Sequence, residues 1–428
     1  MSYESALAYI HAENWQRHKP GLGRTRALLA ALGAPQDALK FIHIAGTNGK
    51  GSTAAMCDAA LRAAGLRVGL FTSPYILRFN ERMQVNGVPI PDEALEALVE
   101  EIRPIADGMA EKPTEFELIT AIGMLYFARE KCDIVVLEVG LGGALDSTNV
   151  IAVPEAAVVT ALGMDHVKEL GPTIADIAAA KAGIFKPGGD AVAYGGVPQA
   201  DAVLAAAAAA AGARLHWVDF SSLRTTARDL DAVTFDYDGL TGVRLPLLGS
   251  YQPYNAATAI TVLRLLLRKG WPVGEAAIRK GLENVSWPGR FELLRREPPF
   301  LLDGSHNAHG MRATAESLRA AFPGKKWIFL LSIMADKDVE AMLDILCPLA
   351  AQAVTVAAAS PRALPAGVLA EKLRARGVAA ESETGVEAGL ARVLALADAQ
   401  NAPAAALGTL YFSGDVRRAF TKLTGTAR

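Results

Sequence analysis

The sequence predicts an α/β fold with two domains, a large one built on a parallel sheet and a smaller α/β one at the C-terminal end. The first observation is the length, because 428 residues exceed what one hydrophobic core usually organises. The second is an alternation of short apolar, β-rich runs with longer helical patterns, which is typical of parallel sheets flanked by helices. The composition, 51% hydrophobic and 21% charged, is that of a globular chain.

The elements of the larger domain follow from this alternation. Expected strands are Phe41–Ile44, Ile134–Val139 and Ala157–Thr160, and expected helices are Ser52–Ala64 and Ile174–Phe185. The apolar stretch Val203–Ala211 is mostly alanine and too short to cross a bilayer, so we expect a helix packed on the surface.

The pattern changes after Asp219. Residues 233–248 are rich in Asp, Gly, Thr and β-formers, which favours a small antiparallel segment before a helix at Asn255–Leu267. A second alternating series then predicts the smaller domain. Its expected strands are Phe300–Asp303, Trp327–Leu331, Ala353–Ala357 and Ala404–Leu407. Prolines and a glycine at 287–299 indicate a hinge, so we predict domains at 1–290 and 300–428 with a linker at 291–299.

Charge and cysteine content exclude several classes of protein. Forty-three basic and 45 acidic residues give a net charge of -2, so no summed field favours nucleic acid or a membrane surface. Three widely spaced cysteines, Cys57, Cys132 and Cys347, support neither a disulfide framework nor a thiolate metal site. Residues 1–15 lack the basic start and apolar region of a signal peptide, so we expect a cytoplasmic protein.

The strongest local motif is a phosphate-binding loop at residues 41–53. An apolar strand runs into glycines, Lys50, a hydroxyl residue and a helix. Glycines let backbone N–H groups approach phosphate oxygens, the helix N-terminus adds a positive dipole, and Lys50 adds a charge. The strict P-loop pattern is varied, because Gly51 follows the lysine and Ile44 stands at the first glycine position. The alternative is a glycine-rich turn with a solvated lysine, but the flanking strand and helix favour nucleotide binding.

The run Gly46–Ser52, together with the segments Thr72–Arg82, Leu137–Asn149 and Leu301–Asn307, resembles the Mur ligase superfamily, and most of all its folylpolyglutamate synthase and dihydrofolate synthase branch. The resemblance covers nearly the whole chain. It implies a large P-loop-type ATPase domain with a parallel sheet and a smaller Rossmann-like α/β C-terminal domain. Tyr75 stands where this branch often has histidine, and its role stays open.

The resemblance assigns roles around the nucleotide. ATP-binding residues are expected at Gly46, Thr47, Asn48, Gly49, Lys50, Gly51, Ser52, Asn255, Arg290 and Asp303. Without the resemblance, Asn255 would be a helix N-cap and Arg290 a linker charge.

Two magnesium ions are expected beside the phosphates. Ser52 and Glu138 offer the oxygen ligands that this hard cation prefers, although Glu138 alone would equally suit a solvated strand end. A single histidine is more often structural, and the resemblance makes His166 a ligand of the second ion. Lys181, at a helix end, would ordinarily cap the last carbonyls. The resemblance instead implies that Lys181 is carbamylated.

Substrate residues are expected on both domains. Phe116 is expected to stack on a pterin ring, unless it is ordinary core, and Asp146 to hydrogen-bond the ring's edge. His306 is expected to reach the glutamate substrate. The full predicted set is Ser73, Arg82, Thr114, Phe116, Asp146, His306 and Thr409, with Lys50, Lys181 and His306 as the catalytic residues. Thr409 stands where the family often has serine.

The implied function is an ATP-dependent ligase that forms an acyl phosphate and then an amide. Its substrates would be ATP, L-glutamate, and dihydropteroate or the glutamate tail of tetrahydrofolates, and the protein would be a monomer. We expect both folate activities. The alternatives are a monofunctional folylpolyglutamate synthase, a muropeptide-type Mur ligase, a nucleotide-hydrolysing switch and a binding module without catalysis. The second α/β domain and the motif at residues 303–306 argue against the switch.

Overall fold

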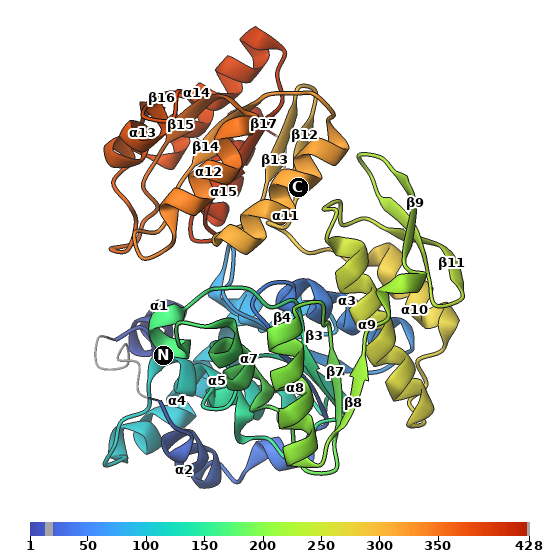
Figure 1. Cartoon of the computed structure of the whole chain (residues 1–428). Helices are drawn as coiled ribbons and strands as arrows, with labels where there is room; N and C mark the ends of the chain where they lie inside the picture. The colour runs from blue at the N-terminus through green and yellow to red at the C-terminus, as the bar shows by residue number, and fades with distance from the viewer. Residues whose placement is uncertain (13–19, 426–428) are drawn as a thin grey trace. The chain divides into compact units, whose positions relative to one another are not determined.

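The fold comes from a computed structural model of the chain, which describes residues 1–12 and 20–425. The expectation of a missing signal peptide concerned residues 1–15, of which 13–15 lie outside the described residues. The chain divides into two compact units. The first contains residues 1–223 and 254–285, and the second contains residues 224–253 and 286–428. Figure 1 shows both units, coloured along the chain.

The first unit is built on an eight-stranded sheet in the order β4-β3-β2-β5-β1-β6-β7-β8. Six neighbouring strands, from β2 to β8 in this order, are parallel, and β3 and β4 add an antiparallel edge. The strands are β1 (Phe41–Ala45), β2 (Val68–Phe71), β3 (Met83–Val85), β4 (Val88–Pro89), β5 (Ile134–Glu138), β6 (Ala156–Val159), β7 (Asp190–Ala193) and β8 (Arg214–Trp217). The three strands expected from the sequence are thus confirmed, and all lie at the centre of the sheet.

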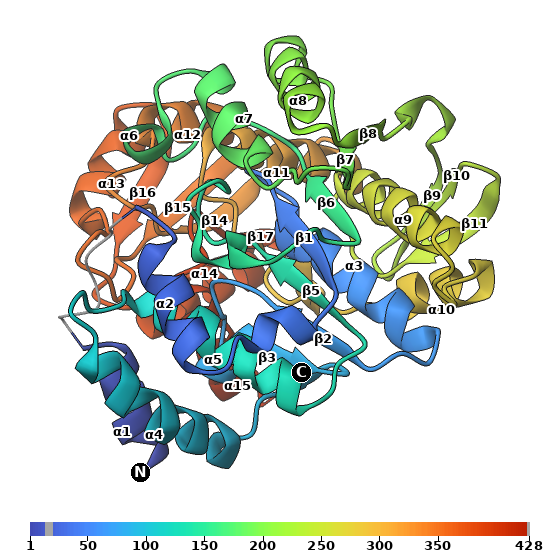
Figure 2. The same ribbon diagram turned by 90° about the horizontal axis from the view of Figure 1, so that it is seen from below.

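Helices cover both faces of this sheet (Figure 2). They are α1 (Tyr3–Ile10), α2 (Gly23–Ala31), α3 (Lys50–Ala63), α4 (Asp92–Gly108), α5 (Glu115–Arg129), α6 (Val167–Leu170), α7 (Ile174–Ala182), α8 (Pro198–Ala211), α9 (Gln252–Arg268) and α10 (Glu275–Asn284). Phe41 and Leu137 face a core shared with α1, α2, α4 and α5, and Ala45 and Val159 continue that face towards α7 and α8. Helix α3 packs on β2 and β5, and on α10.

The second unit contains a six-stranded sheet in the order β12-β13-β17-β14-β15-β16. Its strands are β12 (Glu292–Arg296), β13 (Pro299–Leu302), β14 (Trp327–Leu331), β15 (Ala350–Thr355), β16 (Ala379–Ser382) and β17 (Ala404–Leu407). Only β12 runs antiparallel to its neighbour. Helices α11 (Ala308–Ala321), α12 (Val339–Leu346) and α13 (Ala366–Arg374) cover one face, and α14 (Val386–Gln400) and α15 (Ser413–Thr424) cover the other. The expected α/β unit is confirmed.

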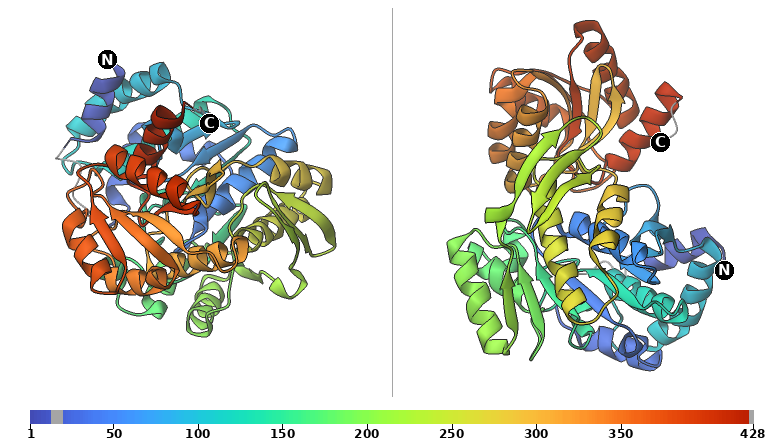
Figure 3. Two further views of the ribbon diagram at one scale, coloured as in Figure 1. Left: turned by 90° about the horizontal axis from the view of Figure 1, so that it is seen from above. Right: turned by 90° about the vertical axis from the view of Figure 1, so that its right-hand side faces the viewer.

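The expected antiparallel segment is also present. Strands β9 (Arg224–Arg228), β10 (Val233–Tyr237) and β11 (Leu240–Leu245) form a three-stranded antiparallel sheet, which lies in the yellow-green part of the ribbon in Figure 3. Residues 224–253 belong to the second unit by their contacts, whereas the sequence placed them in the domain 1–290.

The predicted linker 291–299 contains ordered sheet. Strand β12 spans most of it and pairs with β13, with Arg296 opposite Pro299. Pro298 therefore belongs to a hairpin turn rather than to a connection between domains, and Pro299 is the first residue of its strand, where a missing N–H is tolerated. As a division by function, the boundaries 1–290 and 300–428 stay a prediction.

Two expectations about the whole chain concern helices and cysteines. Within residues 1–12 and 20–425, no helix is long and apolar enough to cross a membrane. Cys57, Cys132 and Cys347 are all free thiols, and the first two are buried.

Candidate active site

The loop after β1 is held in place by the segment that follows β6. The backbone N–H groups of Thr47 and Asn48 both donate to the carbonyl of Ala161, at 3.0 and 3.1 Å. The hydroxyl of Thr160 donates to the carbonyl of Asn48 at 2.8 Å. Gly46 is required here, because its φ is +154° and an added Cβ would lie 1.8 Å from the hydroxyl oxygen of Thr160. Two neighbouring parallel strands thus fix the loop before any ligand arrives.

Helix α3 begins at the end of this loop. Gly49 is its N-cap in the left-handed conformation, with φ 88°, and Lys50 is its first residue. The first N–H groups of a helix have no partner within the helix, and with the dipole they favour an anion. The predicted strand, glycine loop and helix are therefore all present, in the order that a phosphate site needs.

Lys50 folds back over the loop. Its ammonium donates to the carbonyls of Gly46 and Thr47, at 3.2 and 3.4 Å, and lies 3.9 Å from the carboxylate of Glu138. The side chain is 19% exposed, so the charge is partly desolvated, and this strengthens its electrostatic interactions. The cation is preorganised at the loop.

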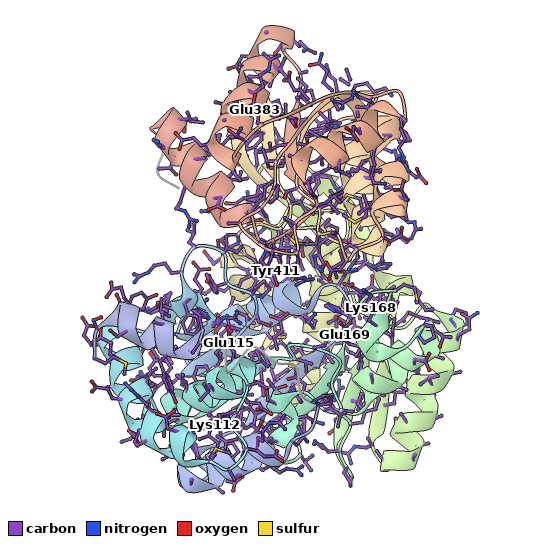
Figure 4. All side chains as sticks on the ribbon, turned by 90° about the vertical axis from the view of Figure 1, so that its left-hand side faces the viewer. Lys112, Glu115, Lys168, Glu169, Glu383 and Tyr411 are labelled. Atoms are coloured by element: carbon purple, nitrogen blue, oxygen red, sulfur yellow. The ribbon has the colours of Figure 1, made fainter. Side chains whose placement is uncertain are left out.

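The three predicted metal ligands follow neighbouring strands. Glu138 ends β5, in register with Ile44 of β1, and alternates onto the face that α3 covers. Ser52 is buried in the first turn of α3, and His166 follows β6 with a left-handed backbone, φ 52°. Helix α6 continues directly from His166 and carries Lys168 and Glu169, both labelled in Figure 4.

The donor chemistry of Ser52 and Glu138 fits magnesium. A hydroxyl and a carboxylate that is 4% exposed are hard oxygen ligands, and magnesium usually completes its shell with phosphates and water. Among residues 1–12 and 20–425, no group of three or more His, Cys, Asp and Glu is arranged to hold an ion without such help.

Lys181 lies buried in the last turn of α7. Its amine donates to the carbonyl of Gly46 at 2.9 Å, so Lys181 and Lys50 contact the same carbonyl of the loop. Burial, and then the nearby charge of Lys50, lower the pKa of Lys181 to about 7, and Asp165 and Asp146 oppose this effect. A large fraction of the amine is therefore neutral and nucleophilic near neutral pH.

The predicted pterin residue Phe116 lies against the loop after β5. An added Cβ at Gly140 would lie 2.4 Å from the ring of Phe116, and the ring meets Phe71 edge-on with centroids 6.1 Å apart. Thr114 caps helix α5 by accepting the N–H of Glu117 at 3.3 Å, and Glu115, labelled in Figure 4, is the first residue of that helix. The capped helix start fixes where the ring lies.

Asp146 organises the same loop. Its carboxylate accepts the backbone N–H groups of Leu141 and Thr148, at 2.8 and 3.0 Å, and its side chain is 7% exposed. Burial raises the pKa of Asp146 above its usual value, against the hydrogen bonds that favour the charged form.

Ser73 and Arg82 flank the segment that joins β2 to β3. The N–H of Ser73 donates to Glu138 at 3.2 Å, which links this segment to the phosphate side. The guanidinium of Arg82 lies over the rings of Tyr75 and Phe79, 5.3 and 5.6 Å from their centroids. Tyr75 therefore supports Arg82, which gives position 75 a structural role.

Asn255, which is predicted to bind the nucleotide, lies beside the phosphate loop. It is 4% exposed in the first turn of α9, and an added Cβ at Gly49 would lie 2.5 Å from its side-chain oxygen. The helix begins at Gln252, so Asn255 is not the N-cap that its sequence context suggests.

In the second unit, Asp303 is the centre of a buried network. It follows β13, is 1% exposed, and accepts from the hydroxyls of Tyr251 and Thr314 and the N–H of Phe291, each at 2.8 Å. These donors hold Asp303 in place, and Asp303 in turn positions the turn that follows it. Arg290 lies against this turn, because an added Cβ at Gly304 would lie 2.5 Å from its guanidinium.

His306 and Thr409 lie on two turns of this unit. The Nδ1 atom of His306 is 3.0 Å from the carbonyl of Gly304, which orients the ring. Thr409 is 1% exposed and its hydroxyl accepts the N–H of Tyr411 at 3.2 Å. Both follow parallel strands, β13 and β17, which are neighbours in the sheet.

Sequence reasoning missed His43. This residue lies in the middle of β1, is completely buried, and its Nε2 atom lies 2.9 Å from the hydroxyl of Thr148. The only signal was a polar side chain inside an apolar strand, which by itself does not separate a functional residue from a satisfied core histidine.

Two models of protein families match this chain. Residues 44–263 match the Mur ligase middle domain, and residues 289–415 match the glutamate ligase domain of Mur ligases. The chain belongs to the Mur ligase family.

Within that family it belongs to the folate branch. It is 40% identical to the dihydrofolate synthase/folylpolyglutamate synthase of Bacillus subtilis, over 80% of this chain and 82% of that protein. It is 39% identical to the folylpolyglutamate synthase of Lacticaseibacillus casei, over 85% of this chain and 88% of that protein. The solved structure of Escherichia coli FolC in complex with DHPP and ADP superposes with a TM-score of 0.86 at 29% identity, covering 99% of this chain and 98% of that one. The protein is an ATP-dependent ligase.

Proposed function

We propose that this ligase joins L-glutamate to dihydropteroate and also to the glutamate tail of tetrahydrofolates. The observation that carries the proposal is the preorganised phosphate loop, on which two lysines of different character, the partly exposed Lys50 and the buried Lys181, converge. A carboxylate oxygen attacks the γ-phosphorus of ATP and ADP leaves, which gives an acyl phosphate. The amine of glutamate then attacks the acyl carbon, loses a proton, and phosphate leaves to give the amide.

Charge neutralisation is the main task of the protein in this sequence of steps. A carboxylate and a triphosphate repel each other, and positioning with preorganised cations is how phosphoryl transfer is usually accelerated. Lys50 already lies on the loop, at hydrogen-bonding distance from two of its carbonyls, so little reorganisation is needed when the nucleotide binds.

Magnesium, if bound, would add positive charge that helps to neutralise the phosphates. Ser52 and Glu138 would hold one ion, and His166 would contribute to a second. We also propose that Lys181 is carbamylated: its neutral amine attacks carbon dioxide, an N–C bond forms and a proton is lost. The lowered pKa of Lys181 favours this reaction.

We also propose roles for residues of the second unit, which follow from the resemblance to the family. Arg290 would pair with phosphate, Asp303 would position the nucleotide through the turn that it organises, and His306 and Thr409 would meet the glutamate substrate. On the acceptor side, Phe116 would stack on the pterin, Asp146 would bond its edge, and Ser73, Arg82 and Thr114 would line its path.

Bifunctionality is supported by one relative's name and left open by another's. The Bacillus subtilis relative is named for both activities and the Lacticaseibacillus casei relative for one, at nearly the same identity. The DHPP complex of the Escherichia coli protein favours a pteridine acceptor over a muropeptide. We propose a cytoplasmic monomer with small-molecule substrates only, in line with the net charge of -2.

The test is acceptor-dependent release of ADP and phosphate. Magnesium ATP and glutamate are mixed with dihydropteroate, with tetrahydrofolate, with a UDP-muramoyl precursor, or with no acceptor. Release with both pteridines establishes two activities, and release with tetrahydrofolate alone selects the monofunctional alternative. Release only with the muramoyl acceptor, or equal release without any acceptor, contradicts the proposal.

A further inference from the structure

A buried chain of hydrogen bonds runs from β1 to the loop after β5. The hydroxyl of Thr148 donates to Asp146. Because a hydroxyl has one hydrogen, its oxygen must act as the acceptor for Nε2 of His43, 2.9 Å away. The order of donors is therefore His43, Thr148, Asp146, and His43 is the tautomer with hydrogen on Nε2.

His43 contributes nothing else that would explain its burial. Among the described residues its ring makes this one hydrogen bond, and the Nδ1 atom has no partner. Burial lowers the pKa of His43 to about 3, so the ring stays neutral under working conditions. An apolar residue would fill the centre of a buried strand at lower cost in desolvation, so the donor itself needs a reason.

The reason lies in what the loop at residues 140–150 separates. On one side, Gly140 contacts the ring of Phe116, the residue expected to stack on the acceptor. On the other side, an added Cβ at Gly143 would lie 2.9 Å from the carbonyls of Ala180 and Lys181. The loop therefore lies between Phe116, where the acceptor is expected to bind, and the helix that carries Lys181.

Asp146 closes this loop, and the chain from His43 fixes Asp146. One carboxylate oxygen accepts from Leu141, and the other accepts from the N–H and hydroxyl of Thr148. Without the donor at His43, the hydroxyl of Thr148 can turn away, and the carboxylate loses one of the bonds that hold it.

We propose that His43 is a positioning residue for the acceptor: through Thr148 it fixes Asp146 and the loop at 140–150, and so sets the affinity for the pteridine acceptor and not for ATP. The inference rests on the proposed function, because it takes the acceptor to be a pteridine-bearing carboxylate.

Two substitutions at Thr148 form a matched pair. Thr148→Val keeps the shape and removes the hydroxyl, and Thr148→Ser keeps the hydroxyl. We expect Thr148→Val to raise KM for dihydropteroate about ten-fold, with KM for ATP changed less than about two-fold, because one buried hydrogen bond is lost. Thr148→Ser should stay close to the unsubstituted protein in both constants.

Substitutions at His43 test whether the two residues act as one chain. His43→Leu should raise KM for dihydropteroate like Thr148→Val, and His43→Gln, whose amide can still donate, should restore most of the affinity. The double variant with His43→Leu and Thr148→Val should have a KM for dihydropteroate no higher than that of the more impaired single variant, since removing either residue breaks the same chain.

The outcomes separate this inference from the proposed function. Absence of acceptor-dependent ADP release in the unsubstituted protein would overturn the function itself. With that activity present, three results would overturn the role of His43: equal rises in both KM values, a Thr148→Ser variant as impaired as Thr148→Val, or additive effects in the double variant. If His43→Leu does not fold, as judged by its unfolding temperature, the Thr148 pair and His43→Gln still decide.

Discussion

At the residue scale, Lys181 is the most informative side chain. A lysine that is 5% exposed and donates to one backbone carbonyl has lost most of its hydration, and this destabilises the charged form. Because the folded protein holds the pKa at about 7 and the usual value is 10.5, the effect on stability depends on pH.

The sign follows from where the proton is bound. Below pH 7 the amine is charged in both folded and unfolded protein, so the penalty of burial is fully present. Between pH 7 and 10.5 the folded protein has released a proton that the unfolded one still binds, so the free energy of unfolding rises with pH. Above that range the penalty is absent.

Replacing this amine should therefore stabilise the protein and inactivate it. We expect Lys181→Met to raise the free energy of unfolding at pH 6 by about 2 kcal/mol and to give no gain at pH 10.5 or above, in buffers free of carbon dioxide. Urea unfolding at several pH values measures this. Ligase activity should fall at least about 100-fold. Lys40→Met, at an exposed lysine, is the control and should change neither quantity; a gain in stability independent of pH would contradict the assigned cause.

Glu138 gives a second prediction at this scale. Glu138→Gln preserves the shape of the side chain and an acceptor for the N–H of Ser73, but it removes the negative charge that a cation needs. We expect kcat to fall about 100-fold and the magnesium concentration for half-maximal activity to rise about ten-fold. A magnesium titration of ADP release is the measurement, with the exposed Glu93→Gln as control. An unchanged magnesium requirement would show that Glu138 is not a magnesium ligand.

At the element scale, the loop between β1 and α3 derives its shape from a neighbouring strand. Thr160 and Ala161, at the end of β6, hold it by side-chain and backbone hydrogen bonds. Gly46 allows this loop to approach Thr160 closely. Glycine is therefore needed at position 46 for packing against the neighbouring strand, in addition to any need for glycine beside the phosphate.

An added methyl group at Gly46 should push the loop off its support. We expect Gly46→Ala to lower kcat/KM for ATP at least about 100-fold, because loop N–H groups move from their positions. Adding Thr160→Ala should restore part of the loss, since the closest clash is with that hydroxyl oxygen. Gly23→Ala, where nothing lies within 4 Å of the added carbon, is the matched control. Equal effects at both glycines would contradict this explanation.

The same scale shows what sequence can and cannot predict. Strands β1, β5, β6, β13, β14, β15 and β17 were predictable because each contains a run of mostly apolar residues that is buried on both faces. In β15 this run begins only at Ala353. Strand β12 was missed: Glu292, Arg295 and Arg296 make its sequence polar, and three nearby prolines suggested a linker. Its pairing with β13 is a tertiary effect that local preference does not contain.

The candidate site was predictable only in part for a similar reason. The phosphate loop has a local signature, and resemblance to the family added Glu138, Lys181 and Asn255. His43 has no such signature, because its role depends on Thr148, a residue 105 positions away. The extensive bonding of Asp303 was equally invisible, since its partners come from three separate segments.

At the scale of the whole molecule, the second unit is assembled from two separate stretches of chain. Tyr251 is a link between them, because its hydroxyl donates to Asp303 at 2.8 Å and Leu248 lies in the same core as Leu301. Burial raises the pKa of Tyr251 well above its usual value, so the hydroxyl keeps its hydrogen.

Removing this link should destabilise the second unit. We expect Tyr251→Phe to lower the free energy of unfolding by about 1–3 kcal/mol, because the buried Asp303 loses a donor. Chemical unfolding followed by circular dichroism measures the change. Tyr254→Phe, three residues on and 41% exposed, is the control and should stay within about 0.5 kcal/mol. Equal losses in the two variants would show that the hydroxyl of Tyr251 is not a specific link.

The packing of α10 on α3 has a consequence for how the protein is made. Gly281 lies so close to Ala60 that an added Cβ would be 2.4 Å from the backbone of that helix. During synthesis on the ribosome, the helix of the phosphate loop emerges early, but the surface that completes its packing is translated more than 200 residues later, after the chain has begun the second unit. The nascent nucleotide site must therefore wait for residues 275–284, and a ribosome pause before them would leave an apolar helix face open to chaperones.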